Sequence, residues 1–156
     1  MKKTNAVRIL EKLNLPYRLR GFKVDPDDLS AERAAELLGV SPQMVFKTLV
    51  ARGTGSGVLV VSLSGDSELD LKALAKLSGS KKVEMVPLKE VQKLTGYMRG
   101  AVSPLGIKAS YPYFLDHSAL QFSEIIVSAG IRGTQIELAP RDLAAATGAV
   151  VGKIAR

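Results

Sequence analysis

Cysteine is absent from the chain and histidine occurs once, and these two shortages exclude several kinds of chemistry. Without cysteine there is no disulfide, no thiol nucleophile and no cysteine-ligated metal. His117 has no neighbour at metal-ligand spacing, so we expect neither a zinc centre nor any other metal or cofactor. A Ser-His-Asp triad could be built only around His117, but the adjacent Asp116 and Ser118 side chains diverge, whereas a triad needs converging groups.

Long apolar runs are also missing. No stretch reaches the roughly 18 apolar residues that a membrane-spanning helix needs. The start, Met1 to Thr4, leads into an amphipathic pattern, so we expect no signal peptide and interpret the protein as cytoplasmic. Its 156 residues, 46% hydrophobic and 24% charged, fit one domain (residues 1–156) with a sizeable core.

Acidic residues are scarce between residues 72 and 108, where most of the net charge of +7 is concentrated. Eight basic residues there face only two acidic ones, and eight minus two leaves +6. Such a concentration suits a polyanionic partner, because it raises both association rate and affinity. A solvated, charge-rich surface would give the same pattern. The basic residues are Lys72, Lys76, Lys81, Lys82, Lys89, Lys93, Arg99 and Lys108.

Capping and turn residues predict helices alternating irregularly with short strands. This alternation, with several hairpins, favours a mixed α/β domain over a doubly wound parallel sheet. The fourth long helix is predicted to bury Leu88, Val91 and Leu94. Expected helices follow Thr4, Ser30, Ser41-Pro42, Asp70, Pro87 and Ala139-Pro140, and expected strands cover residues 17–24, 46–50, 58–63, 83–86, 109–115, 124–128, 135–138 and 149–154.

Lys47 lies where the short helix opened by Pro42 would pass into the apolar strand Phe46 to Val50. An ammonium in such a segment costs free energy unless anions or carbonyls receive it. Lys47 is therefore either a functional cation or a lysine whose head group reaches solvent at the edge of the segment.

Glycine marks two loops of interest. Residues 95–106 contain three glycines and a proline, and residues 128–133 form a second glycine-containing turn. Glycine lets a ligand approach backbone N–H groups closely, and shaped loops often carry function, although a merely long connection would have the same composition. The glycine-rich tip at residues 53–57 lacks the Gly-Lys-Ser/Thr ending of a phosphate loop.

Together these places resemble the YbaK family of aminoacyl-tRNA deacylases, which is related to the editing domain inserted in bacterial prolyl-tRNA synthetases. The resemblance covers nearly the whole chain, and its motifs are specific in their order and spacing although each is weak alone. It implies a compact α/β domain whose mixed sheet curls into a partly closed barrel with helices around it. The matching segments are Lys3–Ala6, Phe46–Leu49, Leu69–Lys72, Lys81–Met85, Thr95–Tyr97, Val102–Gly106 and Ile136–Pro140.

The resemblance also implies a pocket for the aminoacylated 3′ end of a tRNA. Within the family, the similarity is greatest to free-standing enzymes that remove cysteine from mischarged proline tRNA, that also act on cysteine tRNA, and that work beside prolyl-tRNA synthetase. In that type the substrate's own thiol attacks its ester and gives a cyclic thioester. Cleavage of Ala-tRNA(Pro), or non-catalytic binding of charged tRNA or a synthetase, stays open, and nothing indicates the oligomeric state.

Position by position, the resemblance makes Lys47 the essential lysine, which would bind either a terminal phosphate or the ester carbonyl. Many relatives carry tyrosine in place of Phe22, so a hydroxyl is missing here, and alanines at 101 and 129 replace glycines and predict a slightly tighter pocket. The implied substrate-binding residues are Phe22, Thr48, Gly100, Ser128, Ala129 and Gly130, and the implied tRNA contacts are Lys81, Lys82, Arg99 and Arg132.

Overall fold

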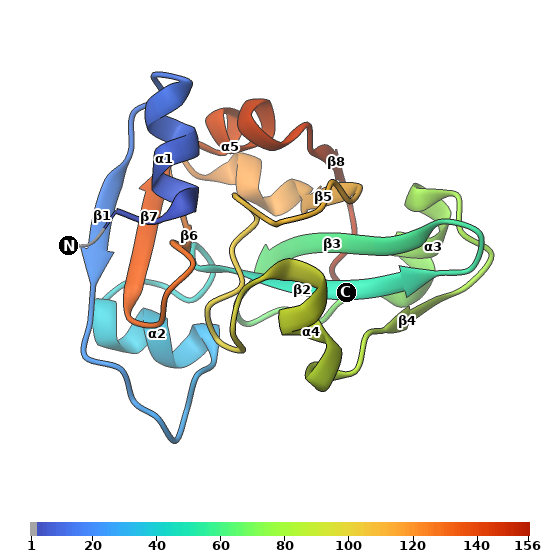
Figure 1. Ribbon diagram of the computed structural model, residues 1–156, viewed down its shortest axis with the longest axis horizontal. Helices are drawn as coiled ribbons and strands as arrows, with labels where there is room; N and C mark the ends of the chain where they lie inside the picture. The colour runs from blue at the N-terminus through green and yellow to red at the C-terminus, as the bar shows by residue number, and fades with distance from the viewer. Residues whose placement is uncertain (1–2) are drawn as a thin grey trace.

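The computed structural model describes residues 3–156 and arranges its strands in two sheets (Figure 1). The first is antiparallel, with the order β1-β7-β6. The second is mixed, with the order β4-β2-β3-β5-β8, in which β5 runs parallel to both β3 and β8. The strands are β1 (Arg18–Gly21), β2 (Phe46–Gly53), β3 (Gly57–Ser64), β4 (Val83–Met85), β5 (Tyr113–Asp116), β6 (Ile125–Ser128), β7 (Thr134–Leu138) and β8 (Val150–Gly152).

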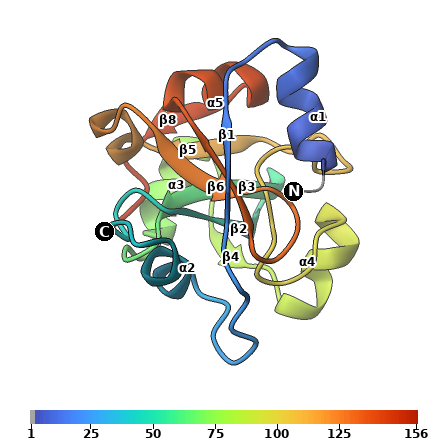
Figure 2. The same ribbon diagram turned by 90° about the vertical axis from the view of Figure 1, so that its left-hand side faces the viewer.

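The mixed α/β class is confirmed, but the expected barrel is wrong, because neither sheet closes on itself. The two sheets meet at a single parallel bridge, Val45 to Ile126, just before β2 begins. Beside that bridge, Ala35 of helix α2 (Ala31–Leu38) packs against Val45 and Ile126 in a small apolar cluster. The sheets therefore diverge from one shared point, and Figure 2 shows α2 lying below β6 in that view.

Five α-helices surround the sheets in the described residues. The predicted caps are confirmed: Thr4, Ser30 and Asp70 each accept a backbone N–H at the start of a helix. Met1 and Lys2, on which part of the signal-peptide expectation rests, lie outside the described residues. The helices are α1 (Asn5–Lys12), α2 (Ala31–Leu38), α3 (Leu71–Ser78), α4 (Leu88–Thr95) and α5 (Pro140–Thr147), with a 3₁₀ turn η1 (His117–Gln121).

Three local predictions differ from the structure. Ser41-Pro42 opens a hydrogen-bonded turn and no helix, because the carbonyls of Pro42 and Val45 accept the N–H of Gly65, at 3.2 and 2.7 Å. On α4, Val91 is buried as expected, but Leu88 is 65% exposed. The predicted strand at 17–24 pairs only over β1, although Phe22 still donates its N–H to Gly133.

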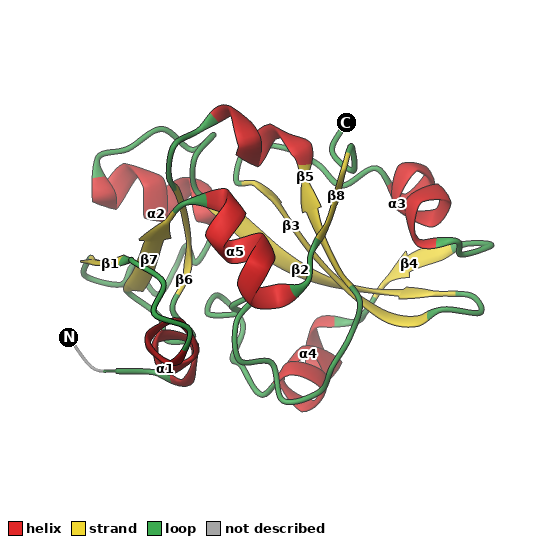
Figure 3. Ribbon diagram, turned by 90° about the horizontal axis from the view of Figure 1, so that it is seen from above, coloured by secondary structure: helices red, strands yellow, loops and turns green. Residues whose placement is uncertain are grey.

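The main core fills the space between the sheets and the helices α1 and α5. It includes Leu10 of α1, Leu143 of α5, Ile136 of β7 and Leu115 of β5, all fully buried. Seen from above, α5 lies across the space where the two sheets part (Figure 3). This packing holds the sheets at a fixed separation and leaves a cavity on the opposite side, toward α2.

Candidate functional site

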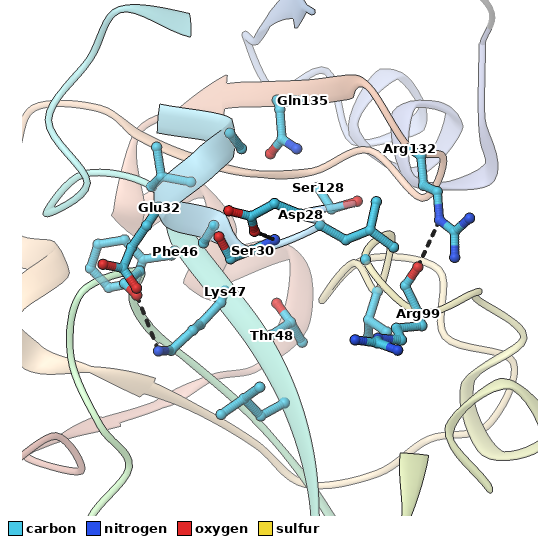
Figure 4. A pocket seen from close by; sticks show the side chains of 18 of the residues that line it. Asp28, Ser30, Glu32, Phe46, Lys47, Thr48, Arg99, Ser128, Arg132 and Gln135 are labelled. Carbon is cyan, nitrogen blue, oxygen red and sulfur yellow. Dashed lines mark hydrogen bonds between the residues drawn. The ribbon is translucent and has the colours of Figure 1, made fainter. Parts of the chain in front are cut away.

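A cavity of about 300 Å³ opens between β2, the ends of β6 and β7, and three connecting segments. The segments are the chain before α2, the start of α4 and the residue 99–102 loop. Figure 4 shows side chains from all of these elements around one space. A cavity of this size suits a small ligand or one end of a larger one.

Lys47 is held in place at this cavity. Its Nζ donates to the carbonyl oxygens of Gly65 at 3.1 Å and Ser67 at 2.6 Å. Figure 4 shows the Lys47 side chain with one dashed hydrogen bond from its Nζ. The turn that carries these carbonyls is itself fixed by the Gly65 N–H bonds to the Pro42 and Val45 carbonyls. An ammonium has three N–H donors, so one remains for a ligand. The sequence-based expectation that a half-buried Lys47 needs anions or carbonyls is met by carbonyls.

Thr48 follows Lys47 and lines the same cavity. Its hydroxyl lies 2.8 Å from that of Ser62, its cross-strand partner on β3. Ser62 is fully buried. A buried residue behind the cavity wall therefore supplies the hydrogen-bond partner of Thr48. This hydrogen bond restricts the rotation of the Thr48 hydroxyl.

The antiparallel sheet contributes Ser128 and Gln135, which are directly opposed on β6 and β7. Gln135 is 7% exposed, and its amide points into the cavity (Figure 4). No group within residues 3–156 hydrogen-bonds that amide, so its donors and acceptor are directed at the cavity. Sequence reasoning missed Gln135. The available signal was a polar residue beside the apolar Ile136 in a short strand that pairs with Ser128.

The rim of the cavity is electrostatically asymmetric. Asp28 and Glu32 lie on the α2 side, whereas Arg99 and Arg132 lie on the opposite side (Figure 4). Hydrogen bonds from the Ser30 side chain and backbone lower the pKa of Asp28, which keeps this carboxylate charged. Arg132 donates from Nε to the carbonyl of Arg99 at 2.9 Å, which ties the two loops together.

Phe22 and Gly100 complete the set of predicted residues that the structure brings to the cavity. Gly100 has a φ of 81°, and a Cβ built there would lie 3.0 Å from the Cβ of Leu29. A side chain at this position would therefore press on the loop before α2 as well as adopt a strained backbone.

Ala129 and Gly130 do not line the cavity. Ala129 is fully buried in the main core, so its methyl group does not narrow the pocket as predicted. Ala101 is also buried away from the lining. Gly130 instead gives room to the ring of Tyr97, because a Cβ there would lie 2.7 Å from Tyr97 Cε1.

Lys81 and Lys82 lie away from the cavity, beside the tip of the β2–β3 hairpin. The backbone of Thr54 exchanges hydrogen bonds with both lysines, and Lys82 pairs with Glu84 at 3.3 Å. Thr54 is seven residues beyond Lys47, so the separation along the extended strand is about 23 Å. These lysines are not part of the pocket. Within residues 3–156, no cluster of histidine and carboxylate side chains could hold a metal ion, and no helix has the length and apolar character to cross a membrane.

These features define a small α/β domain. Its site holds a fixed lysine cation beside turns that present backbone groups, and the chain has no cysteine to act as a nucleophile. The sequence model of the aminoacyl-tRNA editing domain matches residues 25–146. The chain belongs to this family.

Similarity to individual proteins extends beyond the matched region. A candidate Cys-tRNA(Pro)/Cys-tRNA(Cys) deacylase, EbsC of Enterococcus faecalis, is 50% identical over 94% of this chain and 89% of its own length. A proline–tRNA ligase of Maridesulfovibrio salexigens is 31% identical over 72% of this chain but only 19% of the ligase. The crystal structure of a candidate trans-editing enzyme for prolyl-tRNA synthetase superimposes with a TM-score of 0.82 and 26% identity, covering 100% of this chain and 99% of that one.

Proposed function

We propose that the protein is a trans-acting aminoacyl-tRNA deacylase that removes cysteine from Cys-tRNA(Pro) and from Cys-tRNA(Cys). The observation that carries this proposal is the Lys47 ammonium, held by two carbonyls at a cavity of about 300 Å³ in a chain without cysteine. A charged-tRNA substrate supports a cytoplasmic location, and the likeness to part of proline–tRNA ligases supports prolyl-tRNA synthetase as a partner.

The reaction requires little from the protein beyond positioning and charge stabilisation, because an aminoacyl ester is already activated. The substrate thiolate attacks its own ester carbonyl, the carbon–oxygen ester bond breaks, and the ribose oxygen leaves with the proton that the thiol gave up. The products are a cyclic thioester and free tRNA. The third N–H of Lys47 stabilises the negative charge that develops on oxygen, and the cavity holds the reacting groups together.

Cavity size and lining support a small amino acid in this site. Phe22, just after β1, provides an apolar wall, and the Gln135 amide on the neighbouring β7 provides hydrogen-bonding groups. The basic rim at Arg99 and Arg132 supports entry of the nucleic acid from that side, since the α2 side carries carboxylates.

The test is a panel of proline tRNAs charged with cysteine, alanine, serine or proline. We expect the protein to accelerate loss of cysteine well above the spontaneous rate and to leave proline in place. Preferential loss of alanine would identify an Ala-tRNA(Pro) hydrolase instead. Protection of Cys-tRNA from spontaneous hydrolysis would identify a binding protein and overturn the proposed activity.

A further inference from the structure

The cavity borders one edge of β2 and not a face of its sheet. Six consecutive residues line it, from Val45 to Val50. Because side chains of neighbouring strand residues point to opposite faces, Lys47 and Thr48 can border the same space only where the strand presents its edge. The backbone of β2 is therefore part of the cavity wall.

On this edge, Thr48 has no partner strand within residues 3–156. The Val50 carbonyl accepts the Val86 N–H at 3.1 Å, so the backbone groups of Val50 point away from β3. This direction alternates with every residue of an antiparallel strand, and the N–H and carbonyl of Thr48 therefore point the same way. In the described part of the chain, β4 pairs with β2 only over residues 51–53, and the bridge to β6 lies at Val45. The open edge thus offers a ligand one N–H and one carbonyl at Thr48.

The end of the cavity beside Val50 is apolar. Its floor includes Val86 and Val91, which are 5% and 8% exposed. Its rim includes Met85 and Leu88, which are 43% and 65% exposed. Apolar side chains gathered at the mouth of a cavity indicate that a ligand covers them.

Thr48 lies between the lysine cation and this apolar end. From Lys47 to Val50 the strand advances about 10 Å, which is comparable with the length of one nucleoside. Arg99 lies on the loop that also supplies Val102, and Val102 packs in the same apolar cluster as Val50. The cavity therefore presents, in order, a cation, a backbone N–H and carbonyl, and an apolar slot beside an arginine.

We infer that this apolar end binds the 3′-terminal adenine of the charged tRNA and that the open edge at Thr48 recognises it. The inference rests on the proposed deacylase function and specifies which part of the substrate each end of the cavity takes. The adenine amino group donates to the Thr48 carbonyl, and an adjacent ring nitrogen accepts from its N–H. The apolar side chains contact the flat faces of the base, and Arg99 is beside its phosphate. The ester then lies at Lys47, and the amino acid extends toward Phe22 and Gln135.

Other occupants fit the apolar end less well. Guanine and hypoxanthine carry a carbonyl oxygen where adenine carries its amino group, so two acceptors would oppose each other at Thr48. A pyrimidine covers less apolar surface than a purine does. The cysteine side chain is the competing occupant, but it is too small to cover both Met85 and Leu88.

A short RNA that ends in CCA, with cysteine joined by an amide in place of the ester, tests the inference without requiring cleavage. Replacing its terminal adenine by purine, which lacks the amino group, should raise Kd about threefold to tenfold. Hypoxanthine should raise Kd further, because an acceptor then faces the Thr48 carbonyl. Equal Kd values for the three terminal bases would overturn the inference.

NMR spectroscopy shows whether the backbone of β2 takes part. The Thr48 amide signal should shift when the adenine-ended RNA saturates the protein. The Arg52 amide is the matched control and should not shift, because it lies on the same edge but in the part that pairs with β4. An unchanged Thr48 signal at saturation would overturn recognition by the open edge.

Leu88→Ala tests the apolar rim, with Leu120→Ala as its matched control. Leu120 is similarly exposed, at 61%, but does not line the cavity. We expect Leu88→Ala to raise Kd about threefold to tenfold, equally for RNA carrying cysteine or alanine, and Leu120→Ala to leave Kd unchanged. A loss that depends on the amino acid and not on the base would place the amino-acid side chain at this end and overturn the inference. Wild-type protein that discriminates the terminal bases but cleaves no Cys-tRNA(Pro) would instead overturn the proposed function.

Discussion

The Nζ atom of Lys47 lies 2.6 Å from the carbonyl oxygen of Ser67, twenty residues further along the chain. This bond, with the one to Gly65, ties the start of β2 to the turn that follows β3. Lys47 therefore has two separable roles. It closes a turn, and it presents a cation to the cavity.

Lys47→Ala tests both roles at once. We expect deacylation to fall by about 10²–10³, because the fixed positive charge at the ester is lost. The free energy of unfolding should fall by about 1 kcal/mol, since two carbonyls lose a charged donor that is partly exposed to solvent. Single-turnover rates and chemical denaturation measure the two effects. A folded variant with wild-type rate would make Lys47 purely structural.

Lys47→Arg keeps the charge and changes its shape. Guanidinium is longer, planar and forked, so it should not reproduce the two carbonyl bonds and the free N–H in the same place. We expect activity close to that of Lys47→Ala, measured under the same single-turnover conditions. Full activity with arginine would show that Lys47 attracts tRNA diffusely and does not contact the reacting ester.

Replacing one basic residue by glutamate at the cavity rim, and another far from the cavity, distinguishes two roles of positive charge. One role is to guide the 3′ end of the tRNA into the pocket, and the other is to attract the tRNA as a whole. Arg99→Glu changes the rim, whereas Lys81→Glu changes the hairpin tip, about 20 Å away along β2. Arg99 is preferred to Arg132, whose side chain also ties two loops together.

With full-length Cys-tRNA, both variants should bind more weakly. Each should also reduce the slope of log affinity against log salt concentration by about one. With a short substrate that carries only the 3′ end, only Arg99→Glu should raise KM. An unchanged affinity and salt slope in Lys81→Glu would leave the basic segment a solvated surface. An effect of Lys81→Glu on the short substrate would contradict the placement described above.

Gly130 is expected to be required for stability, because it packs against Tyr97. A Cβ would lie 2.7 Å from the ring, and the φ of 100° is unfavourable for alanine. Gly130→Ala should therefore lower the free energy of unfolding by about 3 kcal/mol. Gly55→Ala is the matched control, since Gly55 has a φ of 85° but no atom within 4 Å of a built Cβ. It should cost about 1 kcal/mol. Equal losses would show that the ring contact contributes nothing.

Local features of this fold were predictable from sequence, and features that depend on distant partners were not. The caps at Thr4, Ser30 and Asp70 were correct, because each cap is satisfied within its own helix turn. The Pro42 helix was wrong, because Gly65 takes the carbonyls that the helix would have used.

The candidate site shows the same division between local features and features that depend on distant residues. Lys47, Thr48 and Ser128 were located by motif, and the structure brings all three to one cavity. Gln135 was missed, because its importance comes from lying opposite Ser128 on the neighbouring strand and from an amide that has no hydrogen-bond partner within residues 3–156. Gly130 was placed in the pocket by motif, but its neighbour Tyr97 is thirty-three residues earlier in the chain.

Asp116 should make the stability of the fold sensitive to acid. Its Oδ1 accepts the N–H groups of Ile154 and Ala155 at 2.9 and 3.0 Å, which holds the end of the chain. Burial raises the pKa of Asp116, but hydrogen bonds from Ser118 and these N–H groups outweigh burial and lower it. Because the folded pKa is below the unfolded one, the carboxylate stabilises the fold above the unfolded pKa of about 3.9. That contribution is lost as pH falls through the folded pKa.

Asp116→Asn removes the charge and keeps the shape. We expect it to lower the free energy of unfolding by about 1–3 kcal/mol near pH 7. The difference from wild type should shrink as pH falls below about 4, because the carboxylate is protonated first in the unfolded chain and then, at lower pH, in the folded protein. Denaturation at a series of pH values measures this, with the exposed Asp27→Asn as control. A difference that is constant down to pH 2 would show that charge plays no part at Asp116.

The substrate's own thiol should determine which charged tRNAs are cleaved. The chain has no cysteine to act as an alternative nucleophile, and a hydroxyl is a much poorer nucleophile than a partly ionised thiol near neutral pH. Cys-tRNA(Pro) should therefore be cleaved while the nearly isosteric Ser-tRNA(Pro) survives. The rate should rise with pH up to the pKa of a free thiol, about 8.5, and then level off. Mass spectrometry of the released product should detect the cyclic thioester before water opens it. Equal cleavage of both tRNAs, with no rise in rate toward pH 8.5, would require a water molecule positioned by the protein. The first group to replace would then be the Gln135 amide, which has no hydrogen-bond partner within residues 3–156.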